Sequence, residues 1–137
     1  MQILGLDGKI YKWNPLNDKR IFSSTSSYHN RAKALIKEVY PYDKVIEEVD
    51  LPGTKTAKNG ILRADFFIPT HKKLIEVHGE QHYEFNSFHY ESKAEFRRAK
   101  NRDLTKIKWC EQNNITYIEL PYDEDDDEWR NRILCLN

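Results

Sequence analysis

Two short strand-like segments in the middle of the chain constrain its fold more than any other feature. Residues 61–68 and 74–78 are rich in aliphatic and aromatic side chains, and Pro-Thr-His-Lys-Lys between them suits a hairpin loop. Alternate side chains of a strand point to the same face. The expected first face carries Leu62, Ala64, Phe66 and Ile68, and the expected second face carries Arg63, Asp65 and Phe67. If the strands pair, Asp65 and Glu76 become neighbours on one face.

This pair of carboxylates indicates a metal site. Two adjacent carboxylates repel each other unless a cation or a proton lies between them, and they are suitable ligands for a hard divalent ion. Gly79, Gln81 and His82 follow directly, and an imidazole there could orient or deprotonate a water molecule. The simpler interpretation puts each carboxylate on a solvated strand face. The combination favours metal-assisted hydrolysis, with a phosphodiester as the expected substrate bond.

Length and charge fit a single globular domain. The chain has 137 residues, 22 basic and 22 acidic, and six of the acids form the run 123–128. The rest of the chain is therefore basic. The acidic run precedes a short helical pattern at 128–134, where acids at a helix N-terminus are favoured. The sequence shows no membrane-length apolar run and no signal-peptide pattern, so we expect a cytoplasmic protein, or one in the host-cell cytoplasm if a phage encodes it.

The remaining segments complete an α/β order. Asp7-Gly8 predicts an N-terminal hairpin within an irregular lead at 1–26, and apolar spacing predicts a helix at 28–40. Residues 44–51 suggest a strand with Val45, Glu47, Val49 and Leu51 on one face. A basic helix is expected at 92–113 and a last strand at 115–120. The order helix, three strands, helix, strand predicts a core at 28–122 with a mixed sheet and a helix on each face, followed by an acidic segment and a short helix at 123–137.

This order resembles the PD-(D/E)XK nuclease superfamily, with Asp65 on the second core strand and Glu76 on the third. The segments ADFFIP, LIEVHGEQHY and RDLTKIKWCEQNNITYIELPY resemble a family of small phage and bacterial endonuclease-like proteins related to very-short-patch-repair and some homing endonucleases. The resemblance covers roughly residues 28–122. It implies a three-layer α/β/α restriction-endonuclease-like core, Mg²⁺ or Mn²⁺ as cofactor, and cleavage of DNA.

The resemblance also implies residue roles. Asp65 and Glu76 match the metal-binding acids, and Val77 would offer its backbone carbonyl to the ion. His82 matches a catalytic histidine, and Asp103 matches an aspartate that orients it. The spacing of Asp103 from Ala99 and Ile107 independently puts it on or beside the inward helix face, although a salt bridge to Lys100 or Lys106 would explain it equally well.

Two positions depart from the superfamily pattern. His78 stands where a lysine often follows the strand carboxylate, so either His78 takes over part of that role or His82 does. His29 stands where related families often carry an acid on the first helix, with Glu38 and Glu47 as alternative third acids. A hydrogen-bonded core histidine is the commoner explanation for such a residue. These departures keep open a second function, a non-catalytic nucleic-acid-binding or interaction module on the same fold.

Other polar residues complete the expected site. Gln81 could bind a metal-bound water or the phosphate, and four basic residues are candidates to contact DNA phosphates: Arg63, Lys100, Arg102 and Lys106. Basic residues on a helix, taken alone, are better explained as a solvated surface, and the neighbouring carboxylate pair weakens that explanation. A zinc site from His71, His78, His82 and His89 is disfavoured, because no cysteine lies near to close a tetrahedral set. Oligomeric state stays open, since a homodimer could cut both strands and a monomer could nick one.

Overall fold

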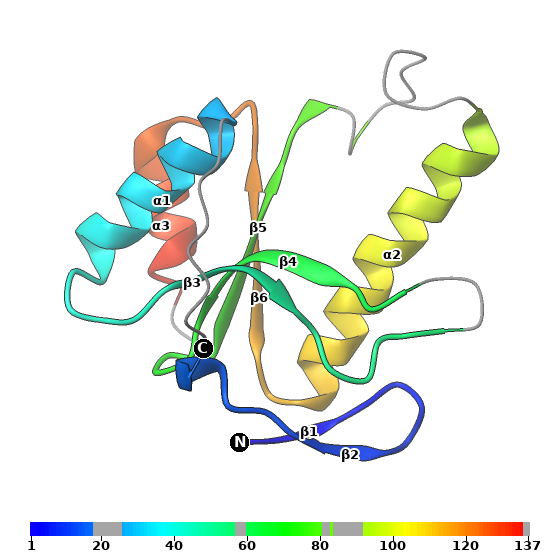
Figure 1. The fold of residues 1–137 in the computed structure, drawn as a ribbon. Helices are drawn as coiled ribbons and strands as arrows, with labels where there is room; N and C mark the ends of the chain where they lie inside the picture. Colours follow the sequence, from blue (N-terminus) through cyan, green and yellow to red (C-terminus); the bar gives the residue numbers. More distant parts are fainter. Residues whose placement is uncertain (18–25, 57–59, 81–82, 84–91, 136–137) are drawn as a thin grey trace.

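The computed structural model describes residues 1–17, 26–56, 60–80, 83 and 92–135. The protein is a mixed α/β structure with a four-stranded sheet, three α-helices and an N-terminal β-hairpin (Figure 1). The elements follow in this order: β1 Gln2–Leu4, β2 Ile10–Lys12, a 3-10 turn Pro15–Asn17, α1 Ser27–Val39, β3 Ile46–Asp50, β4 Arg63–Ile68, β5 Lys73–His78, α2 Lys93–Gln112, β6 Thr116–Pro121 and α3 Asp126–Ile133. The expected order of core helices and strands is confirmed.

The main sheet is mixed, with strand order β3-β4-β5-β6. The two hairpin-like pairs, β3 with β4 and β4 with β5, are antiparallel, whereas β5 and β6 run parallel. Parallel pairing requires a long crossover, and α2 provides it. The recorded β4–β5 ladder pairs Phe66 with Ile75, Phe67 with Leu74 and Ile68 with Lys73.

Two hydrophobic clusters lie on opposite faces of this sheet. On one face α1 and α3 pack over Phe66, Ile75 and Ile118, with Trp129 of α3 fully buried. On the other face α2 contributes Trp109, beside apolar side chains of β3, β4 and β5. Figure 1 shows α1 and α3 on one side of the strands and α2 on the other. In the described part of the chain, no helix is both long and apolar enough to cross a membrane.

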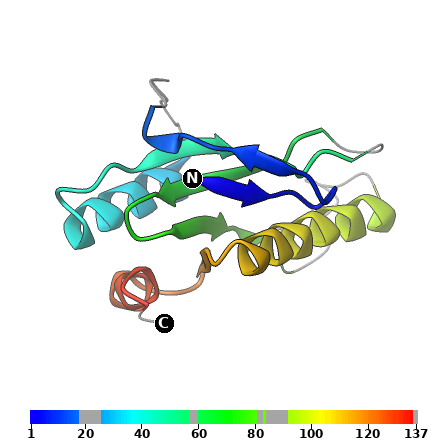
Figure 2. The ribbon, with the colours of Figure 1, turned by 90° about the horizontal axis from the view of Figure 1, so that it is seen from below.

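The N-terminal hairpin completes the core on the α2 side. Ile3 is buried there, and Trp13 stacks on Phe67 with ring centroids 4.8 Å apart and meets Trp109 edge-on at 5.7 Å. Figure 2, seen from below, shows the hairpin lying across the end of the sheet. Leu6 donates a backbone hydrogen bond to the carbonyl of Gly53, which joins the hairpin to the end of β3.

The expected side-chain alternation along β3 and β4 is wrong at one point. Ala64 and Phe67 lie in the α2-side cluster, whereas Phe66 and Ile68 lie in the α1-side cluster. In and directly beside β3, Val45 packs on the α1 side, while Val49 and Leu51 pack on the α2 side. Each strand therefore changes phase near its middle.

The backbone at Glu48 accounts for this change on β3. Glu48 has a φ of 50°, in the left-handed region that side chains other than glycine rarely adopt. The recorded pairs Glu47–Phe66 and Val49–Ala64 flank Glu48 and Asp65, so these two residues lie opposite each other where both strands shift. A uniform period of two could not reveal this irregularity.

Candidate metal centre

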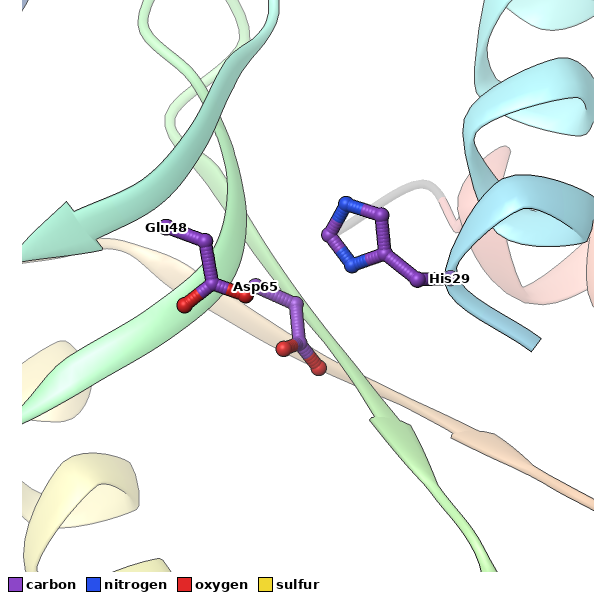
Figure 3. Close-up of side chains that lie close together, drawn as sticks. All are labelled: His29, Glu48 and Asp65. Atoms are coloured by element: carbon purple, nitrogen blue, oxygen red, sulfur yellow. The ribbon is translucent and has the colours of Figure 1, made fainter. Parts of the chain in front are cut away.

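Three side chains from separate elements converge beside this irregular point. His29 of α1, Glu48 of β3 and Asp65 of β4 each offer a ligand atom, and these atoms all lie within 4.8 Å of one another (Figure 3). With Val77 and Gly79 of the following strand and turn, they line a cavity of about 170 Å³. The three residues are called the His29 cluster below.

Local structure positions each member of the cluster. Ser26 caps α1 and its hydroxyl accepts a hydrogen bond from the backbone N–H of His29, so the histidine lies in the first turn of the helix. The ring of His29 stacks on Phe66 with centroids 4.3 Å apart. The Asp65 carboxylate accepts a 2.8 Å hydrogen bond from the backbone N–H of Val77, which fixes its orientation between β4 and β5.

Glu47 orients the histidine from the side opposite the cluster. Its Oε1 lies 3.0 Å from His29 Nε2, and its Oε2 lies 3.1 Å from Lys33 Nζ. With Nε2 engaged by this carboxylate, Nδ1 is the ring atom offered toward Glu48 and Asp65. A carboxylate that binds one ring nitrogen of an imidazole favours the tautomer in which the other nitrogen can bind a metal. Glu47 was a candidate third acid, and the structure instead puts its neighbour Glu48 in the cluster.

The two carboxylates of the His29 cluster, Glu48 and Asp65, repel each other. Partial burial raises the pKa of Glu48, and the neighbouring negative charge of Asp65 raises it further. His29, Arg63 and Lys106 act in the opposite direction. Two carboxylates held this close are stabilised by a bound cation or by a shared proton.

Glu76 is not a member of this cluster. Its carboxylate is buried, and Lys106 Nζ of α2 lies 2.7 Å from its Oε1. The pKa of Glu76 is raised to about 7, chiefly by burial. The charges of Asp65 and Asp103 contribute to this rise, and Lys106 opposes it. Asp65 is thus close enough to Glu76 to influence its ionisation, but the two carboxylates have different partners: the Val77 N–H for Asp65 and Lys106 for Glu76.

His78 is held in a hydrogen-bonded network on β6. Its Nδ1 lies 2.9 Å from Glu119 Oε1, and its Nε2 lies 3.2 Å from the hydroxyl of Tyr117. Tyr83 donates a hydrogen bond to the same Glu119 oxygen. Burial raises the pKa of Tyr117 well above its usual range. His78 is therefore a buried side chain with its own hydrogen-bond partners. The positive charge beside Glu76 comes from Lys106 and not from His78.

The remaining predicted residues are distributed as follows. Arg63 pairs with Asp50 at 3.1 Å, and Lys100 lies 5.1 Å over the ring of Tyr83. Asp103 is half-buried on α2, and Arg102 lines a separate groove. Glu38 contacts Arg130 of α3 at 2.8 Å, away from the cluster.

Two predicted catalytic residues, Gln81 and His82, lie outside the described residues, so the expected pairing of Asp103 with His82 stays a prediction. His89 of the disfavoured zinc set also lies outside them. His71, another of that set, lies 3.0 Å from Asp43 instead.

Sequence reasoning missed Glu48. The available signal was the pair of acids Glu47-Glu48 inside an apolar strand. Successive side chains of a strand point to opposite faces, so one of the two acids faces each side. His29 was noted at the position expected for a first-helix ligand, and the structure brings it beside Asp65.

Comparisons with known proteins give relatives without an assigned activity. The chain is 34% identical over 84 residues to "Uncharacterized protein 307L" of Invertebrate iridescent virus 6, matching 60% of this chain and 43% of the relative. It is 38% identical over 61 residues to "Uncharacterized protein 033L" of Invertebrate iridescent virus 3, with 44% and 31% covered. It is 37% identical over 62 residues to "Uncharacterized protein 094L" of Frog virus 3 (isolate Goorha), with 44% and 40% covered.

These matches span less than half of the relatives' own length. No protein-family model matches the chain, and no solved structure matches it. The chain is therefore similar to viral proteins that are themselves uncharacterized.

Proposed function

We propose that the protein is a metal-dependent endonuclease that hydrolyses phosphodiester bonds in DNA. The observation that carries the proposal is the convergence of His29, Glu48 and Asp65 from three elements, with ligand atoms within 4.8 Å of one another, in a cavity of about 170 Å³. Backbone strain at Glu48 supports it, because non-glycine residues with positive φ concentrate at functional sites.

The donor set fits a small divalent cation. Carboxylate oxygens suit Mg²⁺ and Mn²⁺, and an imidazole nitrogen suits the first-row transition metals, so Mn²⁺ fits this mixed set best. Val77 also lines the cavity and is the residue expected to supply a carbonyl ligand. A cation bound there would polarise the phosphodiester and lower the pKa of a water molecule.

The chain's own residues supply orientation and charge. Glu47 holds the tautomer of His29, and the Val77 N–H holds the Asp65 carboxylate. Lys106, buried against Glu76, supplies positive charge on the α2 side of the same strands. In this proposal Lys106 stabilises the negative charge that develops on the phosphate, Glu76 holds Lys106 in place, and His82, with Asp103, moves the proton.

The proposal extends to the superfamily resemblance and to location. We propose a restriction-endonuclease-like core, because the mixed four-stranded sheet carries α1 and α3 on one face and α2 on the other. DNA is the proposed partner, a homodimer would serve double-strand cleavage, and the cytoplasm of an infected host is the proposed site of action, consistent with the viral relatives.

A cleavage assay tests the activity. Supercoiled plasmid and single-stranded DNA are incubated with the full chain and Mg²⁺ or Mn²⁺, and we expect nicked or linear product from the wild type. Asp65→Asn and Glu48→Gln should lose this activity, because each removes a charged ligand while keeping a hydrogen-bonding side chain. Asp50→Asn, on the same strand as Glu48 but paired with Arg63 on the surface, is the matched control and should remain active. A wild type no more active than Asp65→Asn would refute the proposal.

A second candidate function is a non-catalytic nucleic-acid-binding module on the same fold. The observation that favours it is His78, which stands where a catalytic lysine is expected and is held by Glu119 and Tyr117. The same assay separates the two functions, because the module would bind DNA without cleaving it in either metal.

A further inference from the structure

A polar groove of about 360 Å³ lies between α2 and the connection from β3 to β4. Arg98, Asn101, Arg102 and Thr105 line it from the helix, and Thr54 and Leu62 line it from the connection. The helix residues have the spacing i, i+3, i+4 and i+7, which puts them on one face of α2. Every charged residue that lines the groove is an arginine.

The walls of this groove are fixed by internal hydrogen bonds. The Thr54 hydroxyl donates to the carbonyl of Leu51 at 2.7 Å and accepts from the N–H of Leu62 at 2.8 Å. The Thr105 hydroxyl donates to the carbonyl of Asn101 at 2.8 Å. The two guanidinium groups and the Asn101 amide also line the groove, and all of them can donate hydrogen bonds to a ligand.

The two arginines differ from the other basic residues near the proposed site. Lys106 is paired with Glu76 and Arg63 with Asp50. Among the residues that the structure describes, no ion pair joins Arg98 or Arg102 to an acid. Like charges at i and i+4 on a helix repel each other, and an anion between them removes that repulsion. Guanidinium groups match the geometry of phosphate oxygens.

We infer that this groove binds the sugar-phosphate backbone of a DNA strand and so sets its path toward the His29 cluster. The inference rests on the proposed function for its ligand class. Leu62 lies three residues before Asp65 on the same chain segment, which is about 10 Å along a strand at roughly 3.3 Å per residue. The groove would therefore hold a backbone phosphate near the bond to be cleaved.

Salt-dependent binding tests this inference. Anisotropy of a short labelled DNA duplex is measured with the full chain in EDTA, over a range of KCl concentrations, for the wild type and for the double variant Arg98→Gln/Arg102→Gln. We expect the double variant to bind more weakly. We also expect the negative slope of log K against log salt to become shallower by about 1.8, since each lost phosphate contact removes about 0.9 from its magnitude. Both arginines lie toward the surface, and thermal unfolding should confirm that the variant folds.

The matched control is Arg97→Gln/Lys108→Gln, which removes two exposed charges from α2 outside the groove. An equal loss in both double variants would overturn the inference in favour of diffuse charge. An unchanged slope in the groove variant would overturn it as well. Binding of inorganic phosphate that depends on Arg98 and Arg102, without any effect on DNA, would show a small-anion site and also refute it.

The binding experiment is distinguishable from the cleavage assay. If the protein binds DNA through the groove but cleaves none, the proposed activity fails and the inference about the groove stands. If the protein cleaves DNA while the groove variant binds DNA like the wild type, the proposed activity stands and the inference about the groove fails.

Discussion

Glu48 combines a left-handed backbone with a carboxylate whose pKa is raised by burial and by Asp65. Both features lower the stability of the folded protein. We predict that Glu48→Gly is more stable than Glu48→Ala by about 1 kcal/mol, because both remove the carboxylate and only glycine relieves the positive φ. Urea unfolding of the two variants measures the difference. An alanine variant as stable as the glycine variant would show that the backbone at this position is unstrained.

Glu76 provides a pH dependence with a defined sign. Its pKa in the folded protein is raised to about 7 from an ordinary value of 4.5, so the folded state binds the proton more tightly than the unfolded chain does. Stability from this residue is fully present below about pH 4.5 and is lost as pH rises through about 7. We predict that the unfolding free energy of the wild type, minus that of Glu76→Gln, falls across this window. A difference that rises or stays level would contradict the assignment.

At this scale the sequence located several members of the site but could not assign their partners. Asp65 was singled out by its type and position on a strand, and His29 and Val77 by the superfamily resemblance; all three line one cavity. The partner of Asp65 was expected to be Glu76 and is instead the Val77 N–H, with Glu48 and His29 nearby. Local backbone geometry at Glu48 decides this, and residue type alone gives no sign of it.

The N-terminal hairpin is attached to the core through two glycines in close contact. A Cβ at Gly53 would lie 2.4 Å from the Cα of Gly5, and Gly53 has a φ of 79°. Gly8, in the hairpin turn, has a φ of 81° but nothing within 4 Å of a Cβ. Of these two glycines with positive φ, Gly53 is the one at which a Cβ would also clash with backbone.

We predict that Gly53→Ala destabilises the protein by about 1–3 kcal/mol more than Gly8→Ala, because the two share the cost of positive φ and only Gly53→Ala adds the clash. Thermal unfolding of both variants measures this difference. Equal losses would mean that the hairpin can move away from the end of β3 without cost.

Elements were predicted well where apolar periodicity decides them. Helices expected at 28–40 and 92–113 are found at Ser27–Val39 and Lys93–Gln112, each with a serine N-cap. The strand at 44–51 was expected with one continuous face, and the structure divides it at Glu48. Apolar residues of α2 differ in burial, because Trp109 and Cys110 near its C-terminal end are buried whereas Leu104 is 63% exposed.

At the scale of the whole molecule, the candidate site lies where the irregular part of the sheet meets the start of α1. The two hydrophobic clusters hold α1 and α2 on opposite faces, and β3, β4 and β5 carry the polar residues between them. Pairing across the sheet, rather than nearness in sequence, brings Glu48 beside Asp65. Long-range contacts of this kind are the part of the fold that a sequence pattern specifies least.

Manganese binding tests the central claim most directly. In calorimetric titration of the full chain with Mn²⁺, we predict one site in the wild type, affinity reduced at least about tenfold in Glu48→Gln and Asp65→Asn, and near wild-type affinity in Glu76→Gln, which lies outside the His29 cluster. A wild type that binds no Mn²⁺, or a Glu48→Gln variant that binds it as tightly as the wild type, would contradict the account.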